Sequence, residues 1–176
     1  MADHLFICGI PITGSGASPV SARDPEGVWH GIGSNMTGDA NQIAATSWGS
    51  GYVLVVCGSL VVEIDSVPIV CNVARFDAEA GSLTGSWIPW GLMPYMPSHG
   101  VSSIATGYAG ADKIVIAGGI FSTFQDDEDT PPISAPGVVM RRLAAGSHWE
   151  PLPSRGCNGC GQFSRGMDQY YPGAGA

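Results

Sequence analysis

Lysine, and charged side chains in general, are scarce in this sequence of 176 residues. It carries 7 Lys and Arg against 15 Asp and Glu, charged residues make up 12% of it, and its formal net charge is −8. Lys113 is the only lysine, and the arginines are scattered along the chain. Nucleic acid is therefore not an expected partner, because neutralising phosphates requires a basic patch. So small a charged fraction also predicts that another chain covers part of the surface.

The sequence also lacks long apolar runs and the pattern of a secretory leader. No stretch approaches the roughly 18 apolar residues of a transmembrane helix. The first residues contain no basic segment, and the apolar run after them is broken at Gly9 and Pro11. With 5 cysteines and no visible leader, we expect an intracellular location, either cytoplasmic or organellar.

Motifs of catalysis and of cofactor binding are missing as well. There is no Gly-x-Ser-x-Gly elbow, and the segment 14–16 has no phosphate-loop lysine after it. No two histidines stand at a metal-binding spacing. An enzyme of the galactose-oxidase type would need a copper-ligand set of tyrosines and histidines, and no spacing points to one. We therefore expect a protein that is not an enzyme and that uses no cofactor.

A short apolar segment that ends in glycine occurs three times in the chain. Each copy is followed by an arginine and then by a tryptophan, and successive copies are about sixty residues apart, which is typical of stacked repeats. The copies are Leu5–Gly9, Leu54–Gly58 and Ile114–Gly118; the arginines are Arg23, Arg75 and Arg142; the tryptophans are Trp29, Trp87 and Trp149.

Runs of β-branched residues between glycines and polar turns predict four short strands in each full copy, and no segment has a helical stripe. A four-stranded antiparallel unit repeated radially is a propeller blade. The first copy lacks its leading strand. The expected strands are about 42–47, 52–61, 70–77 and 86–90 in the second copy, and about 102–106, 113–121, 137–143 and 148–152 in the third.

Two segments, 113–121 and 72–83, resemble the two halves of the delta-60 repeat, a kelch-like β-propeller unit found in long extracellular, surface and cell-polarity proteins. The resemblance extends roughly from Leu5 to Leu152 and implies propeller blades, but no particular activity. That family usually runs through many repeats, whereas this chain has two full copies and a partial one.

The expected fold is all-β, a partial β-propeller of about three four-stranded antiparallel blades of which the first is incomplete. Residues 1–153 would form the propeller-like repeats, at about 4–33, 41–91 and 101–153. Residues 154–176 would form a C-terminal tail. A closed propeller needs about four to eight blades, so the open edges should be covered by other protein subunits, or by self-association that completes the propeller.

The tail contains a Cys-x-x-Cys motif formed by Cys157 and Cys160. Such a pair can hold half of a zinc site, form a local disulfide or remain a reduced pair in a loop. It is a weak metal candidate, because no second pair of ligands stands at a matching spacing. Cys8 and Cys57 occupy equivalent positions in the repeat, where the third copy has Ala117, which predicts small core residues.

Two further patterns have structural explanations. The acidic segment 125–129 lacks the spacing of a calcium loop and predicts a solvated hairpin tip, or else a contact with a basic partner. The three tryptophans of the repeat predict packing between blades. His30 and His148 each lie beside one of them, which favours packing at a blade edge over metal binding.

We expect a non-catalytic structural or interaction subunit of a larger protein assembly, which binds through open sheet edges, the loop 92–97 and the tail. The alternative is a carbohydrate-binding propeller lectin, in which Trp48 and Trp90 would stack on sugar rings. The candidate contact residues are Leu92, Met93, Tyr95 and Met96 in the loop, and Tyr170 and Tyr171 in the tail.

Overall fold

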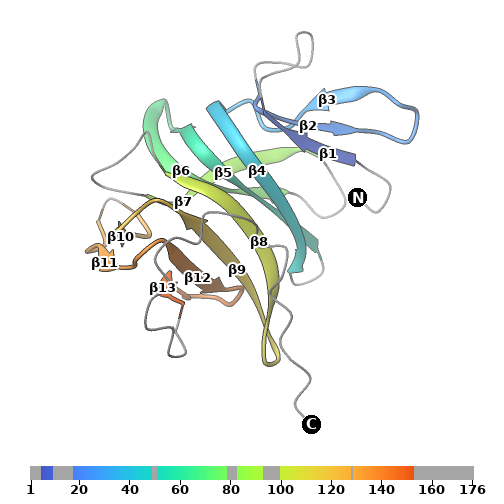
Figure 1. Cartoon of the computed structure of the whole chain (residues 1–176). Helices are drawn as coiled ribbons and strands as arrows, with labels where there is room; N and C mark the ends of the chain where they lie inside the picture. Colours follow the sequence, from blue (N-terminus) through green and yellow to red (C-terminus); the bar gives the residue numbers. More distant parts are fainter. Residues whose placement is uncertain are drawn as a thin grey trace.

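The structure is a computed structural model that describes residues 5–9, 18–48, 51–78, 83–92, 100–127 and 129–152. Every regular element in these ranges is a β-strand, and every strand pairing is antiparallel, which confirms the all-β prediction. The described part of the chain has no helix with the length and apolarity that a membrane span requires. Figure 1 shows three main sheets that follow one another from the first, in blue, to the third, in yellow to orange.

The first sheet has three strands, in the order β1-β2-β3. They are β1 (Leu5–Cys8), β2 (Val20–Arg23) and β3 (Trp29–Gly31). These are the second, third and fourth strands of the expected unit, and the described residues contain no leading strand for it. Leu5 lies opposite Arg23 and Arg23 opposite Trp29, so these three side chains form one row on the same face of the sheet.

The second sheet is a four-stranded meander in the order β4-β5-β6-β7. Its strands are β4 (Met36–Trp48), β5 (Gly51–Ile64), β6 (Val67–Ala78) and β7 (Gly85–Gly91). All four were predicted, and each of them extends beyond its expected bounds at both ends. As expected, β5 runs through Gly58 without ending there. The hairpin between β5 and β6 turns at Asp65 and Ser66, whose φ angles of 50° and 65° fit a two-residue type I′ turn.

The third sheet has the order β8-β9-β12-β13, which is the same meander. Its strands are β8 (Val101–Ala109), β9 (Asp112–Gly119), β12 (Val138–Arg142) and β13 (Glu150–Pro151). Between β9 and β12 the chain adds a small two-stranded sheet of β10 (Thr123–Phe124) and β11 (Ile133–Ser134), which the sequence did not predict. Two-residue strands are too short to show a periodic pattern.

The β-bulges show that the second and third sheets match each other with a shift of one residue from the match of Gly58 with Gly118 that the sequence repeat gave. Gly58 lies opposite Ala40 beside one register shift, and Gly119 lies opposite Val101 beside the other. A Cβ atom at Gly58 would collide with the carbonyl oxygen of Asp39 in β4, and one at Gly119 with that of Gly100, just before β8. Gly58 therefore corresponds to Gly119 and not to Gly118, because the close backbone approach requires glycine at that place.

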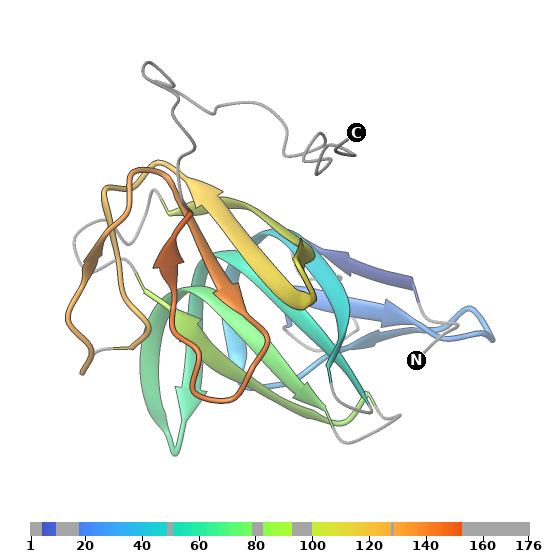
Figure 2. The ribbon, with the colours of Figure 1, turned by 90° about the horizontal axis from the view of Figure 1, so that it is seen from below.

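Two apolar clusters lie between successive sheets. Figure 2 shows how the strands of these sheets are arranged. One joins residues of the first and second sheets, including Val20, Ile32 and Trp87. The other joins the second and third sheets and includes Val55 and Trp149. Neighbouring residues of a strand alternate between the two faces, so the second sheet is buried on both sides. Each of the three main sheets remains open, with two edge strands.

Candidate functional site

Trp87 joins the second sheet to the first. Its indole Nε1 donates a 2.8 Å hydrogen bond to the carbonyl of Ile32, just beyond β3, and the side chain is 0% exposed. Phe76 packs against it with a ring-centroid distance of 5.1 Å. Gly33 provides the space, since a Cβ there would overlap Cδ1 of Trp87. Asn35 holds the Trp87 backbone, because its Oδ1 accepts from Trp87 N and its Nδ2 donates to Trp87 O, both at 2.9 Å.

Trp149 joins the third sheet to the second in the same manner. Its indole Nε1 donates to the carbonyl of Trp90 at the end of β7, and its side chain is 3% exposed. The rings of Trp90 and Phe124 lie at centroid distances of 5.4 and 5.3 Å from it. Gly91 provides the space here, since a Cβ would lie 2.6 Å from the Phe124 ring. The carboxylate of Asp126 accepts a 3.0 Å hydrogen bond from Trp149 N.

These two contacts, which we call tryptophan joints, follow one rule. The carbonyl that accepts the indole N–H belongs to the residue three places after the tryptophan of the preceding sheet, and glycine is the fourth. Trp29-His30-Gly31-Ile32-Gly33 and Trp87-Ile88-Pro89-Trp90-Gly91 both show this order. The sequence predicted that the tryptophans pack between units but missed the glycines, although this spacing was visible in both copies.

Trp29 heads the row on the first sheet that matches the rows at the two joints. Phe6 and Cys8 pack toward the second sheet, so their neighbour Leu5 and the rest of its row point the other way. Leu5 is 58% exposed, and Trp29 is half-buried where Trp87 and Trp149 are buried. Among the described residues, none accepts a hydrogen bond from the Trp29 indole. The first sheet thus carries the tryptophan of a joint but not the sheet that would receive it.

A polar cluster lies beside the second joint. The guanidinium carbons of Arg75 and Arg141 lie 5.6 and 4.8 Å from the ring centroid of Trp90, within the range of cation–π attraction. Arg141 Nη1 donates to Asp126 at 3.0 Å, and both side chains are mostly buried. Burial lowers the pKa of the Arg141 guanidinium, while the negative charge of Asp126 acts in the opposite direction. His148 Nδ1 lies 2.5 Å from the other oxygen of Asp126.

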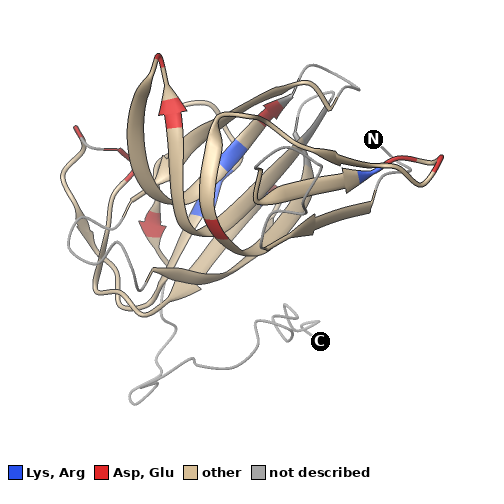
Figure 3. Ribbon diagram, turned by 90° about the horizontal axis from the view of Figure 1, so that it is seen from above, with Lys and Arg blue, Asp and Glu red and all other residues tan. Residues whose placement is uncertain are grey.

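This cluster corrects the expectation for the acidic segment. Asp126 was predicted to lie on a solvated hairpin tip or to contact a basic partner, yet its side chain is 12% exposed. It pairs with Arg141 of the same chain, which the sequence could not show because Asp126 lies in the loop between β10 and β11 while Arg141 lies on β12. Asp127 and Asp129 are exposed, as predicted. Figure 3 shows that acidic residues lie mainly at strand ends and tips, while the few basic residues lie within strands.

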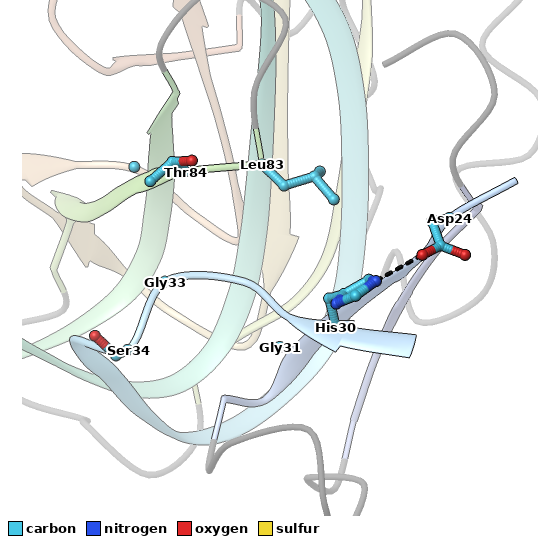
Figure 4. A pocket seen from close by; sticks show the side chains of 8 residues that line it. Asp24, His30, Gly31, Gly33, Ser34, Leu83 and Thr84 are labelled. Atoms are coloured by element: carbon cyan, nitrogen blue, oxygen red, sulfur yellow. Dashed lines mark hydrogen bonds and ion pairs between the residues drawn. The ribbon is translucent and has the colours of Figure 1, made fainter. Parts of the chain in front are cut away.

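An open depression of about 530 Å³ lies between the first and second sheets (Figure 4). His30 Nε2 is 2.7 Å from Asp24 Oδ2 on one side of it, and Leu83 and Thr84 lie on the other. The hydrogen bond from His30 is the main reason why the pKa of Asp24 is lowered. The His30 side chain is 49% exposed, so the expected packing at a blade edge is replaced by a hydrogen bond to a carboxylate. Enclosed reaction sites exclude water, whereas this depression is open to it.

The other candidate contact and binding residues are placed as follows. Leu92 was expected in an exposed loop, but it is 7% exposed in the cluster between the first two sheets, and its backbone pairs with Gln125. Trp90 is 6% exposed, so it has no free face for a sugar ring. Within the described ranges, no group of three or more His, Cys, Asp or Glu could hold a metal ion. The following lie outside the described residues: Met93, Tyr95, Met96, Cys157, Cys160, Tyr170, Tyr171 and the side chain of Trp48.

Cysteine burial follows the prediction of small core residues. Cys57 and Cys71 are 0% exposed, and Cys8 is half-buried. Burial raises the pKa of both Cys57 and Cys71 to about 12 and also raises that of Cys8. Because the thiolate is the reactive form, Cys57 and Cys71 stay protonated and unreactive at neutral pH.

We expect iodoacetamide at pH 8 to leave Cys57 and Cys71 unmodified in the native chain and to modify both in urea. Peptide mapping by mass spectrometry reads each site separately. The half-buried Cys8 should react more than these two and serves as the internal comparison. Native labelling of Cys57 at the rate seen in urea would contradict its placement between the sheets.

The fold and its joints define a class of all-β protein, built from open antiparallel sheets stacked through tryptophans. Comparison of the chain with known proteins found no matching family model, no matching curated protein and no matching solved structure.

Proposed function

We propose that the chain is a non-catalytic structural subunit that binds other protein through the outward face of its first sheet and through its open sheet edges. The observation that carries this proposal is the outward-facing row of Leu5, Arg23 and Trp29. Its counterparts, Leu54-Phe76-Trp87 on the second sheet and the row headed by Trp149 on the third, are buried against a neighbouring sheet.

Three features support this proposal. The meanders of the second and third sheets have the form of propeller blades, and the resemblance to kelch-like repeats fits such units. Within the described ranges β1 is an edge strand of its sheet, and an edge strand can add the strand of a partner. Charged residues make up only 12% of the chain, which is a low fraction for a protein whose whole surface is exposed to water. The loop 92–97 and the tail stay candidate contacts, with the exception of Leu92, which is buried.

The test is the mass of the native particle that contains this chain, measured by light scattering on material taken from its source without overexpression. We expect a mass well above the 18.1 kDa of the chain. A native particle of 18.1 kDa would contradict the proposal, because the row of Trp29 would then face water. No described residue favours the carbohydrate-binding alternative, since Trp90 is buried.

A further inference from the structure

The outer edge of β1 lies where the second and third sheets each hold one more strand. β4 pairs with β5 in the second sheet and β8 pairs with β9 in the third, whereas none of the described strands pairs with the outer edge of β1. The rows headed by the tryptophans make β1 the counterpart of β5. β1 also lies close to β4, as β5 lies close to β8. A strand added beside β1 would therefore contact both β1 and β4.

Two side chains beside this edge are less buried than their counterparts. Cys8, on β1, packs toward the second sheet and is half-buried, whereas Cys57, at the same place on β5, is 0% exposed. Ile43, on β4, packs toward the first sheet and is half-buried, whereas Ile104, at the same place on β8, is 1% exposed. Apolar surface is thus left uncovered on both strands that the added strand would contact.

The backbone of β1 is oriented to pair with such a strand. Gly9 N donates a 3.0 Å hydrogen bond to Pro19 O, on the side of β2. The N–H groups of an extended strand alternate between its two edges, so the N–H of Cys8 points to the outer edge. An antiparallel strand that accepts from this N–H would give the first sheet the form of the second and third.

The chain contains two leading strands, β4 and β8, and they share a short sequence pattern. Gln42-Ile43-Ala44-Ala45 lies opposite residues 57 to 54 of β5, and Ser103-Ile104-Ala105-Thr106 holds the same place beside β9. Both segments have the order polar residue, isoleucine, alanine, small residue. The same register beside β1 would place the polar residue opposite Cys8 and the isoleucine opposite Ile7.

The polar residue of this pattern links one leading strand to the next. Gln42 Oε1 accepts a 2.9 Å hydrogen bond from Ile104 N, which joins β4 to β8. Ile43 N holds the same place on β4 as Ile104 N does on β8. A glutamine in the strand beside β1 would therefore accept from Ile43 N.

We infer that the edge of β1 receives a strand from a separate partner protein, antiparallel to β1, with the sequence Gln-Ile-Ala-Ala or a close variant of it. This inference rests on the proposed function and states the chemistry of the partner. The contact between β4 and β8 inside the chain continues into the new one, because the partner strand contacts β4 as β4 contacts β8.

The test uses a synthetic peptide, Asp-Ala-Asn-Gln-Ile-Ala-Ala-Thr-Ser, which copies residues 39–47 of β4. Titration of the isotope-labelled chain with this peptide, followed by NMR, gives the Kd. Hydrogen exchange in the same samples reports on the Cys8 amide. We expect this amide to exchange rapidly in the chain alone and to become protected when the peptide binds.

Two peptide variants show whether the peptide binds as the predicted strand. Ile104 N points away from β9, so the next amide points toward it, and Ala44 is the counterpart of that residue. Ala44→Pro in the peptide therefore removes a ladder hydrogen bond and should raise the Kd about tenfold or more. Gln42→Ala in the peptide should also raise it, because the bond to Ile43 N is lost.

A variant of the chain provides the matching control on the side of β1. Cys8→Pro removes the N–H that points to the outer edge, and an edge strand tolerates proline where its N–H faces solvent. This variant should stay folded by circular dichroism and should no longer bind the peptide. If it does not fold, the two peptide variants still decide the question.

Each outcome has a distinct meaning. Protection of the Cys8 amide by the parent peptide, together with much weaker binding of the Ala44→Pro peptide, supports the inference. The inference is overturned if the peptide does not bind, if it binds without protecting this amide, or if the amide is already protected in the chain alone. If the peptide fails while the native particle is larger than 18.1 kDa, the proposed function stands. A native particle of 18.1 kDa overturns both.

Discussion

Trp87→Ala is expected to lower the free energy of unfolding by about 3–5 kcal/mol, the usual cost of truncating a fully buried aromatic side chain. Trp87 is 0% exposed, packs on Phe76 and donates its indole N–H to the Ile32 carbonyl. Truncation removes the packing of the indole between the first two sheets and one of the two hydrogen bonds that the Ile32 carbonyl accepts, the other of which comes from Ser18 Oγ. Equilibrium unfolding in urea, followed by far-UV circular dichroism, measures the change.

Trp29→Ala is the matched control, because Trp29 stands at the same place in its own row but is half-buried. It should destabilise the monomer by much less than Trp87→Ala does. Equal losses from the two variants would mean that Trp29 is already part of a packed core, and the distinction between a filled joint and an empty one would be wrong.

Asp126→Asn is expected to cost about 3–5 kcal/mol, as for breaking a buried ion pair from one side. The Asp126 and Arg141 side chains are 12% and 16% exposed, so the amide would leave a mostly buried arginine without its countercharge. Asparagine keeps the Oδ1 atom that accepts from Trp149 N, so the loss comes from the missing countercharge and from Oδ2, where the amide would place an NH2 group against His148 Nδ1. The loss of stability should be visible in the same urea experiment.

Asp129→Asn is the control for this variant, because Asp129 lies in the same loop and is exposed. It removes the same formal charge, so any general effect of the net charge of −8 appears in both variants. A loss of similar size in the two would assign the effect to overall charge and contradict the role of Asp126 at the joint.

Much of the fold could be predicted from the sequence, because strands can be recognised from the local pattern of residues. The β-branched run in β5 and the glycines and turns around it give the strand and its neighbours without any knowledge of tertiary contacts. The position of the bulges could not be predicted to the residue. Gly118 and Gly119 are adjacent, and only the close approach to the backbone of β8 shows that Gly119 is the counterpart of Gly58.

The candidate site was harder to predict, since it depends on contacts between residues far apart in the chain. The tryptophans were found by their repeat spacing. Asp126, in contrast, could not be distinguished from the other carboxylates of its loop. Its ion pair with Arg141 forms because the loop between β9 and β12 folds back beside its own sheet and the end of β7. Leu92 was misplaced for the same reason, as the bridge to Gln125 buries it.

The central claim is that two tryptophan joints are filled within the chain and that a third tryptophan is left facing outward. Hydrogen exchange of the indole N–H groups, followed by NMR and assigned with single Trp→Phe variants, tests it most directly. In a dilute solution of the folded chain, we expect the Trp87 and Trp149 indoles to be protected and the Trp29 indole to exchange rapidly. Protection of Trp29 equal to that of Trp87, or rapid exchange of Trp87 or Trp149 in the folded chain, would contradict the account.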